Sequence, residues 1–250
     1  MRHVVELHSK AVNVHIKNRN EAISLRGSKS LQSNPLKKDM LLNRRRREVD
    51  LFLKTYYDSS VWTRTYYLGY SVLKCPLDLW IYQEIIYQIQ PDLIVETGTY
   101  NGGSALYMAH VCDIIGTGEI LTIDINYKDN RPSHPRIKYL LGSSTSDDTV
   151  EKVKNIAADR KNIMVILDSD HTEKHVYSEL KIYSKFVSKG SYLIVEDSII
   201  NGNPVRENFG PGPAEAIGKF LGENSEFKID YSREKFLVTF NSKGYLKKIK

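Results

Sequence analysis

The stretch Leu93-Ile-Val-Glu-Thr-Gly-Thr-Tyr-Asn-Gly-Gly-Ser104 decides the fold of this 250-residue chain. An apolar run leads into the glycines, and a helical pattern over residues 105–112 leads out of them. A strand that breaks on glycines and restarts as a helix is the usual nucleotide-binding turn of an α/β sheet. Gly98 permits the tight turn, and Gly102 and Gly103 allow backbone and ligand to approach closely. The stretch therefore predicts a nucleotide-like ligand at the end of this strand.

The spacing of these glycines excludes the commoner phosphate-binding loops. Gly98-x-x-x-Gly102-Gly103 is neither the Gly-x-Gly-x-x-Gly of dinucleotide enzymes nor a loop that ends in Gly-Lys-Ser/Thr. Glu96 stands at the end of the strand, and its negative charge disfavours a phosphate group. A carboxylate at this position suits ribose hydroxyls or a cationic ligand.

Strand and helix patterns alternate after this stretch. The alternation predicts an α/β fold, a doubly wound and mostly parallel sheet with right-handed crossovers. A helix is expected before the first strand, with Asp78 as its N-cap. The strands are expected at residues 93–97, 120–125, 137–141, 163–167, 192–195, 227–229 and 236–240, and the later helices at 102–113, 146–158, 172–188 and 213–221.

Charge separates the chain into two parts. Residues 1–60 contain 13 Lys/Arg and 6 Asp/Glu, which gives +7, and the remaining residues contain 36 − 13 = 23 and 30 − 6 = 24, which gives −1. We therefore expect a basic, helical N-terminal extension, residues 1–74, and a catalytic domain, residues 75–250. Two cysteines allow no disulfide framework, and no signal peptide or membrane span is evident, so a cytoplasmic protein is expected.

The N-terminal extension carries the basic character. Residues 1–35 are expected to be partly disordered or loosely helical, and residues 36–58 are expected to form a helix that contains Arg44-Arg-Arg-Arg47. This run is a candidate for peripheral contact with an anionic membrane. A solvated helix face or an oligomer contact is the alternative, and we favour it. Nucleic acid is not expected as a partner, because no reading motif accompanies the charge.

Aromatic side chains are dense between residues 61 and 75. Flat rings with a polar edge suit stacking on a sugar, and they suit packing equally well. Packing is the favoured interpretation, and stacking stays open. The aromatic residues are Trp62, Tyr66, Tyr67 and Tyr70.

Acidic residues stand at the end of nearly every predicted strand. Because ligands of such sheets bind outside the carboxyl ends of the strands, these carboxylates converge on one edge. Crowded carboxylates repel one another unless a cation lies among them, and Mg²⁺ prefers oxygen ligands. We predict a metal site of Asp168, Glu196 and Asp197, in which Asp168 and Glu196 face each other across adjacent strands. The acidic set is Glu96, Asp124, Asp168, Asp170, Glu196 and Asp197.

Two further residues of this edge have predicted roles. Asp124 ends the second strand, where nucleotide-binding units place the acceptor for ribose hydroxyls. His171 follows Asp168 within a turn and is the candidate general base. His175 is four residues further on, but the segment between them does not match His-Glu-x-x-His, so a zinc protease is not supported and His175 is expected on a helix surface.

Several stretches together resemble one family. The glycine motif is similar to the first motif of class I S-adenosylmethionine-dependent methyltransferases. The chain more narrowly resembles rhamnosyl O-methyltransferases and cephalosporin hydroxylase proteins over about residues 60–245. The stretches that carry this likeness are Leu73-Lys-x-Pro-Leu-Asp-Leu-Trp-Ile-Tyr-Gln-Glu84, the glycine motif, Leu167-Asp-Ser-Asp-His171, Tyr192-Leu-Ile-Val-Glu-Asp197 and Gly210-Pro-Gly-Pro213.

The resemblance implies a Rossmann-like methyltransferase fold, with a seven-stranded sheet, helices on both faces and an antiparallel last strand pair. It implies S-adenosylmethionine and Mg²⁺ as cofactors and a sugar or glycoside hydroxyl as acceptor. Asp168, Glu196 and Asp197 would hold the metal, and His171 would be the base. The cofactor-binding residues would be Glu96, Gly98, Tyr100, Gly102, Gly103, Ser104, Asp124, Ser143, Ser144 and Asp168.

Two alternative functions stay open beside that of a sugar O-methyltransferase. One is a hydroxylase component on the same fold, although an iron triad of two His and one carboxylate is not evident. The other is a non-catalytic cofactor-binding scaffold at an anionic membrane. A homo-oligomer is expected in each case, and the acceptor cannot be transferred from the resemblance because the N-terminal part departs from it.

Overall fold

The structure is a computed structural model that describes the backbone of residues 35–250 and the side chains from Asn43 onward, Arg45 excepted. The predictions for residues 1–34 lie outside these described residues. The chain divides within helix α2 (Pro35–Asp58), and the compact unit that begins at Val49 contains the whole sheet. The domain boundary predicted near residue 75 stays a prediction.

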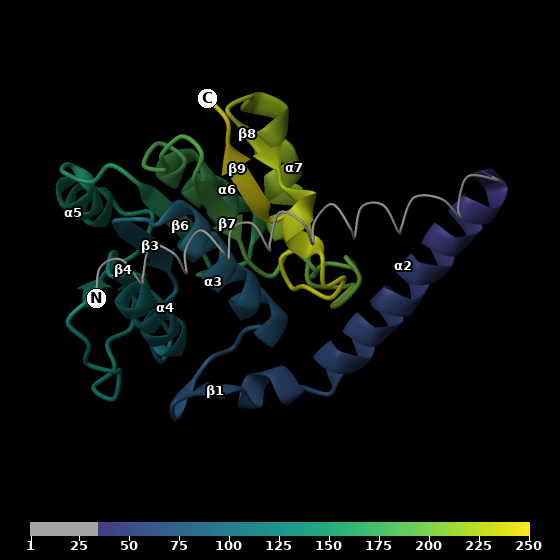
Figure 1. Ribbon diagram of the computed structural model, residues 1–250, viewed down its shortest axis with the longest axis horizontal. Helices are drawn as coiled ribbons and strands as arrows, with labels where there is room; N and C mark the ends of the chain where they lie inside the picture. Colours follow the sequence, from purple (N-terminus) through teal and green to yellow (C-terminus); the bar gives the residue numbers. More distant parts are fainter. Residues whose placement is uncertain (1–34) are drawn as a thin grey trace, which may run out of the picture. The chain divides into compact units, whose positions relative to one another are not determined.

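A seven-stranded sheet in the order β5-β4-β3-β6-β7-β9-β8 forms the centre of this unit (Figure 1). The first five strands pair in parallel, whereas β9 pairs antiparallel with both β7 and β8. The strand order reverses at β3, which lies between β4 and β6, and such a reversal opens a ligand crevice. The strands are β3 (Leu93–Thr97), β4 (Glu119–Asp124), β5 (Ile137–Leu141), β6 (Ile163–Leu167), β7 (Tyr192–Val195), β8 (Phe227–Ile229) and β9 (Tyr245–Lys248).

Helices cover both faces of the sheet because successive strand side chains point to opposite sides. In β3, Leu93 and Val95 enter the core cluster that contains residues of α5, α6 and α7, whereas Ile94 enters the cluster that contains residues of α3 and α4. The predicted fold class, with helices on both faces, is confirmed. The helices are α3 (Pro76–Ile89), α4 (Gly103–Ile115), α5 (Asp147–Ala157), α6 (Glu173–Tyr183) and α7 (Pro213–Glu223).

Short elements connect α2 to α3. They are the 3₁₀ helix η1 (Val61–Arg64) and a hairpin of β1 (Tyr66–Tyr67) and β2 (Tyr70–Ser71); a second 3₁₀ helix, η2 (Tyr231–Glu234), follows β8. Within residues 35–250, none of the helices is both long and apolar enough to cross a membrane.

The last predicted strand is wrong, and Asp78 explains why. Residues 236–240 have a strand-like apolar pattern, but the strand that joins the sheet is β9. The backbone N–H of Phe240 and the hydroxyl of Thr239 donate to the Asp78 carboxylate instead. Asp78 is also not the predicted N-cap, since Cys75 holds that position and Asp78 lies buried inside α3. This one carboxylate therefore fixes the C-terminal segment against α3.

We predict that Asp78→Ala destabilises the fold strongly, because it leaves the Thr239, Phe240 and Tyr245 donors without their acceptor. Loss of a buried hydrogen-bonded charge costs about 3 kcal/mol or more. Urea unfolding measures the change, with the exposed Asp148→Ala as the control, for which less than about 1 kcal/mol is expected. Equal losses in the two variants would contradict the role given to Asp78.

Candidate active site

A cavity of about 600 Å³ opens at the carboxyl ends of the parallel strands. Its volume lies within the range of small-molecule sites. Most of the predicted site residues line it, whereas Glu96, Gly102 and Glu196 do not. The lining includes Gly98, Tyr100, Gly103, Ser104, Asp124, Ser143, Ser144, Asp168, His171 and Asp197.

The glycine turn lies against the neighbouring strand end. Gly98 has a φ of +87°, and a Cβ added there would lie 1.8 Å from the carbonyl oxygen of Asp168. A Cβ on Gly103 would lie 2.4 Å from the carbonyl oxygen of Ser71. The missing side chains let β3, β6 and the start of α4 close around the same cavity, which fits a cofactor bound along the turn.

Glu96 lies beneath the turn. It is fully buried on the α4 side of the sheet, where Ser104 and Thr122 donate to its two oxygens at 2.6 and 2.7 Å. Burial raises the pKa of Glu96, against the lowering effect of Lys74 and these hydroxyls. The structure shows Glu96 fixing the turn, and its predicted contact with the cofactor stays a prediction.

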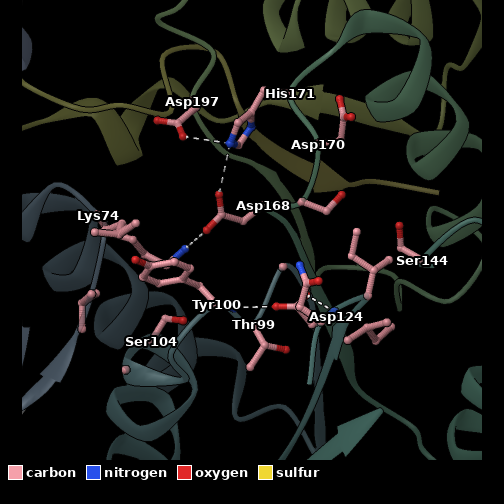
Figure 2. Close-up of a pocket in the computed structure, with 18 of the residues that line it drawn as sticks. Lys74, Thr99, Tyr100, Ser104, Asp124, Ser144, Asp168, Asp170, His171 and Asp197 are labelled. Atoms are coloured by element: carbon pink, nitrogen blue, oxygen red, sulfur yellow. Dashed lines mark hydrogen bonds and ion pairs between the residues drawn. The ribbon is translucent and has the colours of Figure 1, made fainter. Parts of the chain in front are cut away.

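Asp124, Ser143 and Ser144 line the part of the cavity next to the glycine turn. Asp124 accepts from the backbone N–H of Tyr100 at 2.8 Å (Figure 2). It also accepts from Arg131 at 2.8 Å, so two donors hold its carboxylate. Ser143 and Ser144 follow β5 and line the cavity next to it. The predicted contact of Asp124 with ribose hydroxyls, and of the two serines with the cofactor, stays a prediction.

Three of the predicted residues form a compact group on the other side of the cavity. The Nε2 atom of His171 lies 3.3 Å from Asp197 Oδ2 and 3.9 Å from Asp168 Oδ1 (Figure 2). One ligand atom from each residue lies within 4.8 Å of the others. Two carboxylates with an imidazole fit a divalent cation, and a hard ion such as Mg²⁺ takes the carboxylate oxygens.

Glu196 directly follows β7 and Asp168 directly follows the paired strand β6; the two face each other, as predicted, but the side chain of Lys74 lies between them. The Lys74 ammonium donates to Asp168 Oδ2 at 2.5 Å and to Glu196 Oε1. Tyr82 donates to the same Glu196 oxygen at 2.7 Å. The predicted metal triplet is therefore assembled only in part, because Glu196 lies outside the cavity lining and is paired with Lys74.

Burial is the main cause that shifts the pKa values of these acids. Burial raises the pKa of Asp168 to about 6, against the lowering effect of Lys74 and His171. Burial and the Asp168 charge raise the pKa of Glu196 to about 7. Burial lowers the pKa of Lys74, but Asp168 and Glu196 outweigh it and raise that pKa above its ordinary value. The cluster is short of positive charge, which is the setting that favours a cation.

The sequence analysis missed His175 as a site residue. It is partly buried, lines the cavity, and has its Nε2 atom 3.2 Å from Ser144 Oγ and 3.4 Å from Glu179 Oε1. The hydrogen bond to Glu179 raises the pKa of His175. The helical spacing of the sequence predicted the helix that contains His175. It did not predict that the loop after β5 covers His175, so the expected position on the helix surface is wrong.

The wall beyond Asp197 is aromatic and basic. Tyr57 from α2, Trp62 from η1 and Arg206 line this end of the cavity. The Tyr57 and Trp62 rings are stacked with centroids 5.1 Å apart, and the Trp62 indole donates to the Tyr57 carbonyl at 3.0 Å. Trp62 therefore both packs and faces the cavity, so the two interpretations of the aromatic segment are compatible.

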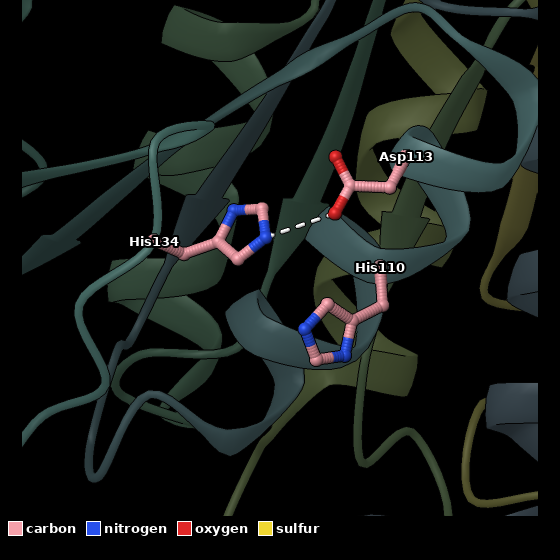
Figure 3. A group of neighbouring side chains, drawn as sticks. All are labelled: His110, Asp113 and His134. Carbon is pink, nitrogen blue, oxygen red and sulfur yellow. Dashed lines mark hydrogen bonds and ion pairs between the residues drawn. The ribbon is translucent and has the colours of Figure 1, made fainter.

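A second group with histidines consists of His110, Asp113 and His134, which do not line this cavity (Figure 3). Its side chains contact residues of the protein itself. His134 Nε2 lies 3.0 Å from Asp113 Oδ2, and the backbone N–H of Arg136 donates to His134 Nδ1. Since Nδ1 accepts, Nε2 carries the proton and donates to Asp113. The Arg136 side chain also donates to Asp113 at 2.6 Å. These contacts oppose metal binding, and the group that includes His110 links α4 to the segment before β5.

Comparison with known proteins identifies the family. The family described as rhamnosyl O-methyltransferase/CmcI matches residues 59–249. The chain belongs to this family. The rhamnosyl O-methyltransferase of Mycobacterium bovis (BCG Pasteur) is 41% identical over 200 residues, which is 77% of this chain and 82% of the relative. That of Mycobacterium leprae is 39% identical over 199 residues, 77% and 87% of the two chains.

Solved structures of CmcI share the fold. An apo structure has a TM-score of 0.60 at 21% identity and covers 75% of this chain and 77% of CmcI. A structure with Mg and SAM has a TM-score of 0.58 at 18% identity and covers 75% and 78%. The predicted family and the Rossmann-like O-methyltransferase fold are confirmed. The family match begins after the run Arg44–Arg47, so it gives no information on that run.

We predict that Gly98→Ala abolishes cofactor binding, because the new Cβ meets the Asp168 backbone. Gly190→Ala is the matched control, since Gly190 has the same φ of +87° with nothing within 4 Å of the added carbon. Backbone strain alone costs about 1–2 kcal/mol in each variant. Equilibrium dialysis with labelled S-adenosylmethionine measures binding, and equal affinity in the two variants would contradict a role for close packing at the turn.

Proposed function

We propose that this protein is a Mg²⁺-dependent, S-adenosylmethionine-dependent O-methyltransferase that acts on a hydroxyl of a sugar in a glycan or glycoside. Membership of an O-methyltransferase family establishes the class of enzyme. The observation that carries the proposal is the arrangement of one cavity, with the glycine turn on one side and the Asp168, His171 and Asp197 group on the other.

The cofactor would lie along the glycine turn. Gly98 and Gly103 provide backbone without side chains, Asp124 offers a carboxylate to ribose hydroxyls, and Ser144 with His175 lines the adenine end. The cofactor supplies a methyl group on a positively charged sulfur. The acidic rim next to the turn favours that charge over an anionic guest.

The acceptor would lie on the other side of the cavity. Asp168 and Asp197 would hold Mg²⁺, an ion that acidifies a hydroxyl and fixes its position. His171, whose Nε2 atom lies 3.3 Å from Asp197 Oδ2, would take the hydroxyl proton. Alignment of the hydroxyl oxygen with the methyl group then supplies much of the rate. Glu196 would become a third ligand only if Lys74 released it.

Two observations support a sugar as the acceptor. The curated relatives are named rhamnosyl O-methyltransferases. The far wall of the cavity contains Trp62 and Tyr57, whose rings suit the apolar face of a sugar, and Arg206, whose guanidinium donates to hydroxyl oxygens. This wall supports a sugar, and the names of the relatives make a rhamnoside the first acceptor to test.

Incubation with methyl-labelled S-adenosylmethionine and a panel of rhamnosides and other glycosides tests the proposal. We expect label in the sugar with Mg²⁺ present and at least a hundredfold less after treatment with EDTA, restored by added Mg²⁺. Transfer that continues at full rate in EDTA would contradict the metal site. Cofactor binding without transfer to any hydroxyl in the panel would favour a non-catalytic scaffold.

We predict that His171→Ala lowers kcat by at least a hundredfold and leaves the dissociation constant of S-adenosylmethionine within about threefold of the unchanged protein. His110→Ala is the control, because His110 contacts Tyr67 and does not line the cavity. Steady-state kinetics and calorimetry measure the two quantities. Full turnover in the His171 variant would remove this residue as the base.

The remaining predictions concern location and assembly. Four proposals are kept: peripheral contact of the Arg44–Arg47 run with an anionic membrane, a homo-oligomer, a cytoplasmic location, and a place at the inner face of the membrane. They require lipid-binding and solution-mass measurements on the full chain.

A further inference from the structure

Glu179 is a fully buried acid of α6 that the proposed reaction does not use. Its Oε1 atom accepts from the Ser169 hydroxyl at 2.8 Å and lies 3.4 Å from His175 Nε2. Its Oε2 atom has no hydrogen-bond partner among the described residues. A buried carboxylate with an unpartnered oxygen stabilises a fold less than an apolar side chain of similar size would. The two contacts of Glu179 therefore point to a role other than stability.

The face of α6 that carries Glu179 also holds the loop after β5. His175, Glu179 and Tyr183 follow one another at intervals of four residues, so they lie on one side of the helix. The Nε2 atom of His175 lies 3.2 Å from Ser144 Oγ, and the Tyr183 hydroxyl donates to the Ser144 carbonyl at 2.8 Å. Ser144 lines the cavity, so the position of this part of its wall depends on α6.

The other contact of Glu179 reaches the segment that carries the proposed base. Ser169 lies directly after Asp168 and two residues before His171, and all three line the cavity. Figure 2 shows Asp168 and His171 in the same view as Ser144. In the described sheet, β3 and β4 separate β6 from β5, so the strands that precede these two segments do not pair. Side chains of α6 make the connection instead.

Glu179 orients the imidazole of His175. A carboxylate only accepts hydrogen bonds, so Glu179 takes the proton that His175 carries on Nε2. The hydrogen bond to Glu179 raises the pKa of His175; burial lowers that pKa, and the charges of Glu179 and Asp170 raise it further. Ser169 and His175 share the Oε1 atom, so the two donors compete for one acceptor. The described contacts join Ser169 to His175 only through Glu179.

We propose that Glu179 is a positioning residue that links segment 168–171 to His175 and, through Ser144, to the part of the cavity wall that the cofactor would contact. The inference deepens the proposed function, because the identity of the ligand at that wall rests on it. The link itself is a property of the ligand-free protein, so the link and the proposed function can be tested separately.

The first experiment is an NMR titration of the His175 imidazole in the ligand-free protein with EDTA present. The signals of this ring are assigned by their absence from the spectrum of His175→Gln. Glu179→Gln removes the charge that holds the proton, so the pKa of His175 is expected to fall. Ser169→Ala removes the competing donor and leaves Glu179 to His175 alone, so the pKa of His175 is expected to rise further.

The second experiment measures the dissociation constant of S-adenosylmethionine by calorimetry. Glu179→Gln and His175→Ala are each expected to raise this constant by about tenfold. Because Glu179 acts through His175, the double variant is expected to lie within about twofold of His175→Ala. If Glu179 only stabilised the fold, its replacement would leave the constant unchanged or would add its effect to that of His175→Ala. The control for both experiments is Ser178→Ala, since the Ser178 hydroxyl donates to the Lys174 carbonyl within α6, and no change is expected.

Shifts of the His175 pKa in the same direction in Glu179→Gln and Ser169→Ala, or an unchanged pKa in Ser169→Ala, would overturn the inference. Additive effects on the dissociation constant would overturn it as well. Should Glu179→Gln not fold, Ser169→Ala decides the link by itself, because the partly exposed Ser169 is replaced without loss of a buried charge. If the unchanged protein bound no S-adenosylmethionine, the proposed function would fail and the titration of His175 alone would decide the link.

Discussion

The close approach of the glycine turn to the next strand is the contact on which the site depends. At the point where the strand order reverses, the backbone of Gly98 lies so near the Asp168 carbonyl that no side-chain carbon fits between them. This contact brings the end of β3, which is followed by the glycines, against the end of β6, which is followed by Asp168 and His171. A cofactor-sized cavity and a cation-sized group of ligands therefore share one wall.

The negative charge of the acidic strand ends is the second constraint, and the alternation of side chains along the strands distributes it. Glu96 and Glu196 lie buried on the face covered by α3 and α4, where hydroxyls, Tyr82 and Lys74 satisfy them. Asp168 is shared between Lys74 and the cavity. Asp197 leaves the alternation through its positive φ and joins His171 in the cavity. The same acidic edge thus has a buried half that stabilises the fold and an open half that is available for chemistry.

Much of this arrangement follows from local pattern. Five of the seven predicted strands have the observed bounds, because apolar runs of buried strands end where carboxylates or turn residues begin. Residues 236–240 have the same pattern but hydrogen-bond to Asp78, a partner about 160 residues away in the chain. His175 was expected at the surface, and the loop after β5 covers it. Both errors involve contacts between segments distant in sequence, which periodicity does not contain.

The sequence by itself determined the family, the doubly wound sheet, the glycine turn and the acidic strand ends, since each depends on residues that are neighbours along the chain. Only the tertiary structure decided which partners the acidic side chains contact. In the structure, Glu96 lies beneath the turn and Glu196 is paired with Lys74. Trp62 and Tyr57 line the far wall of the cavity. The physical reason is that a buried charge pairs with the cation and hydrogen-bond donors that packing brings next to it. Packing joins segments that are far apart in the sequence, so the sequence pattern does not reveal these contacts.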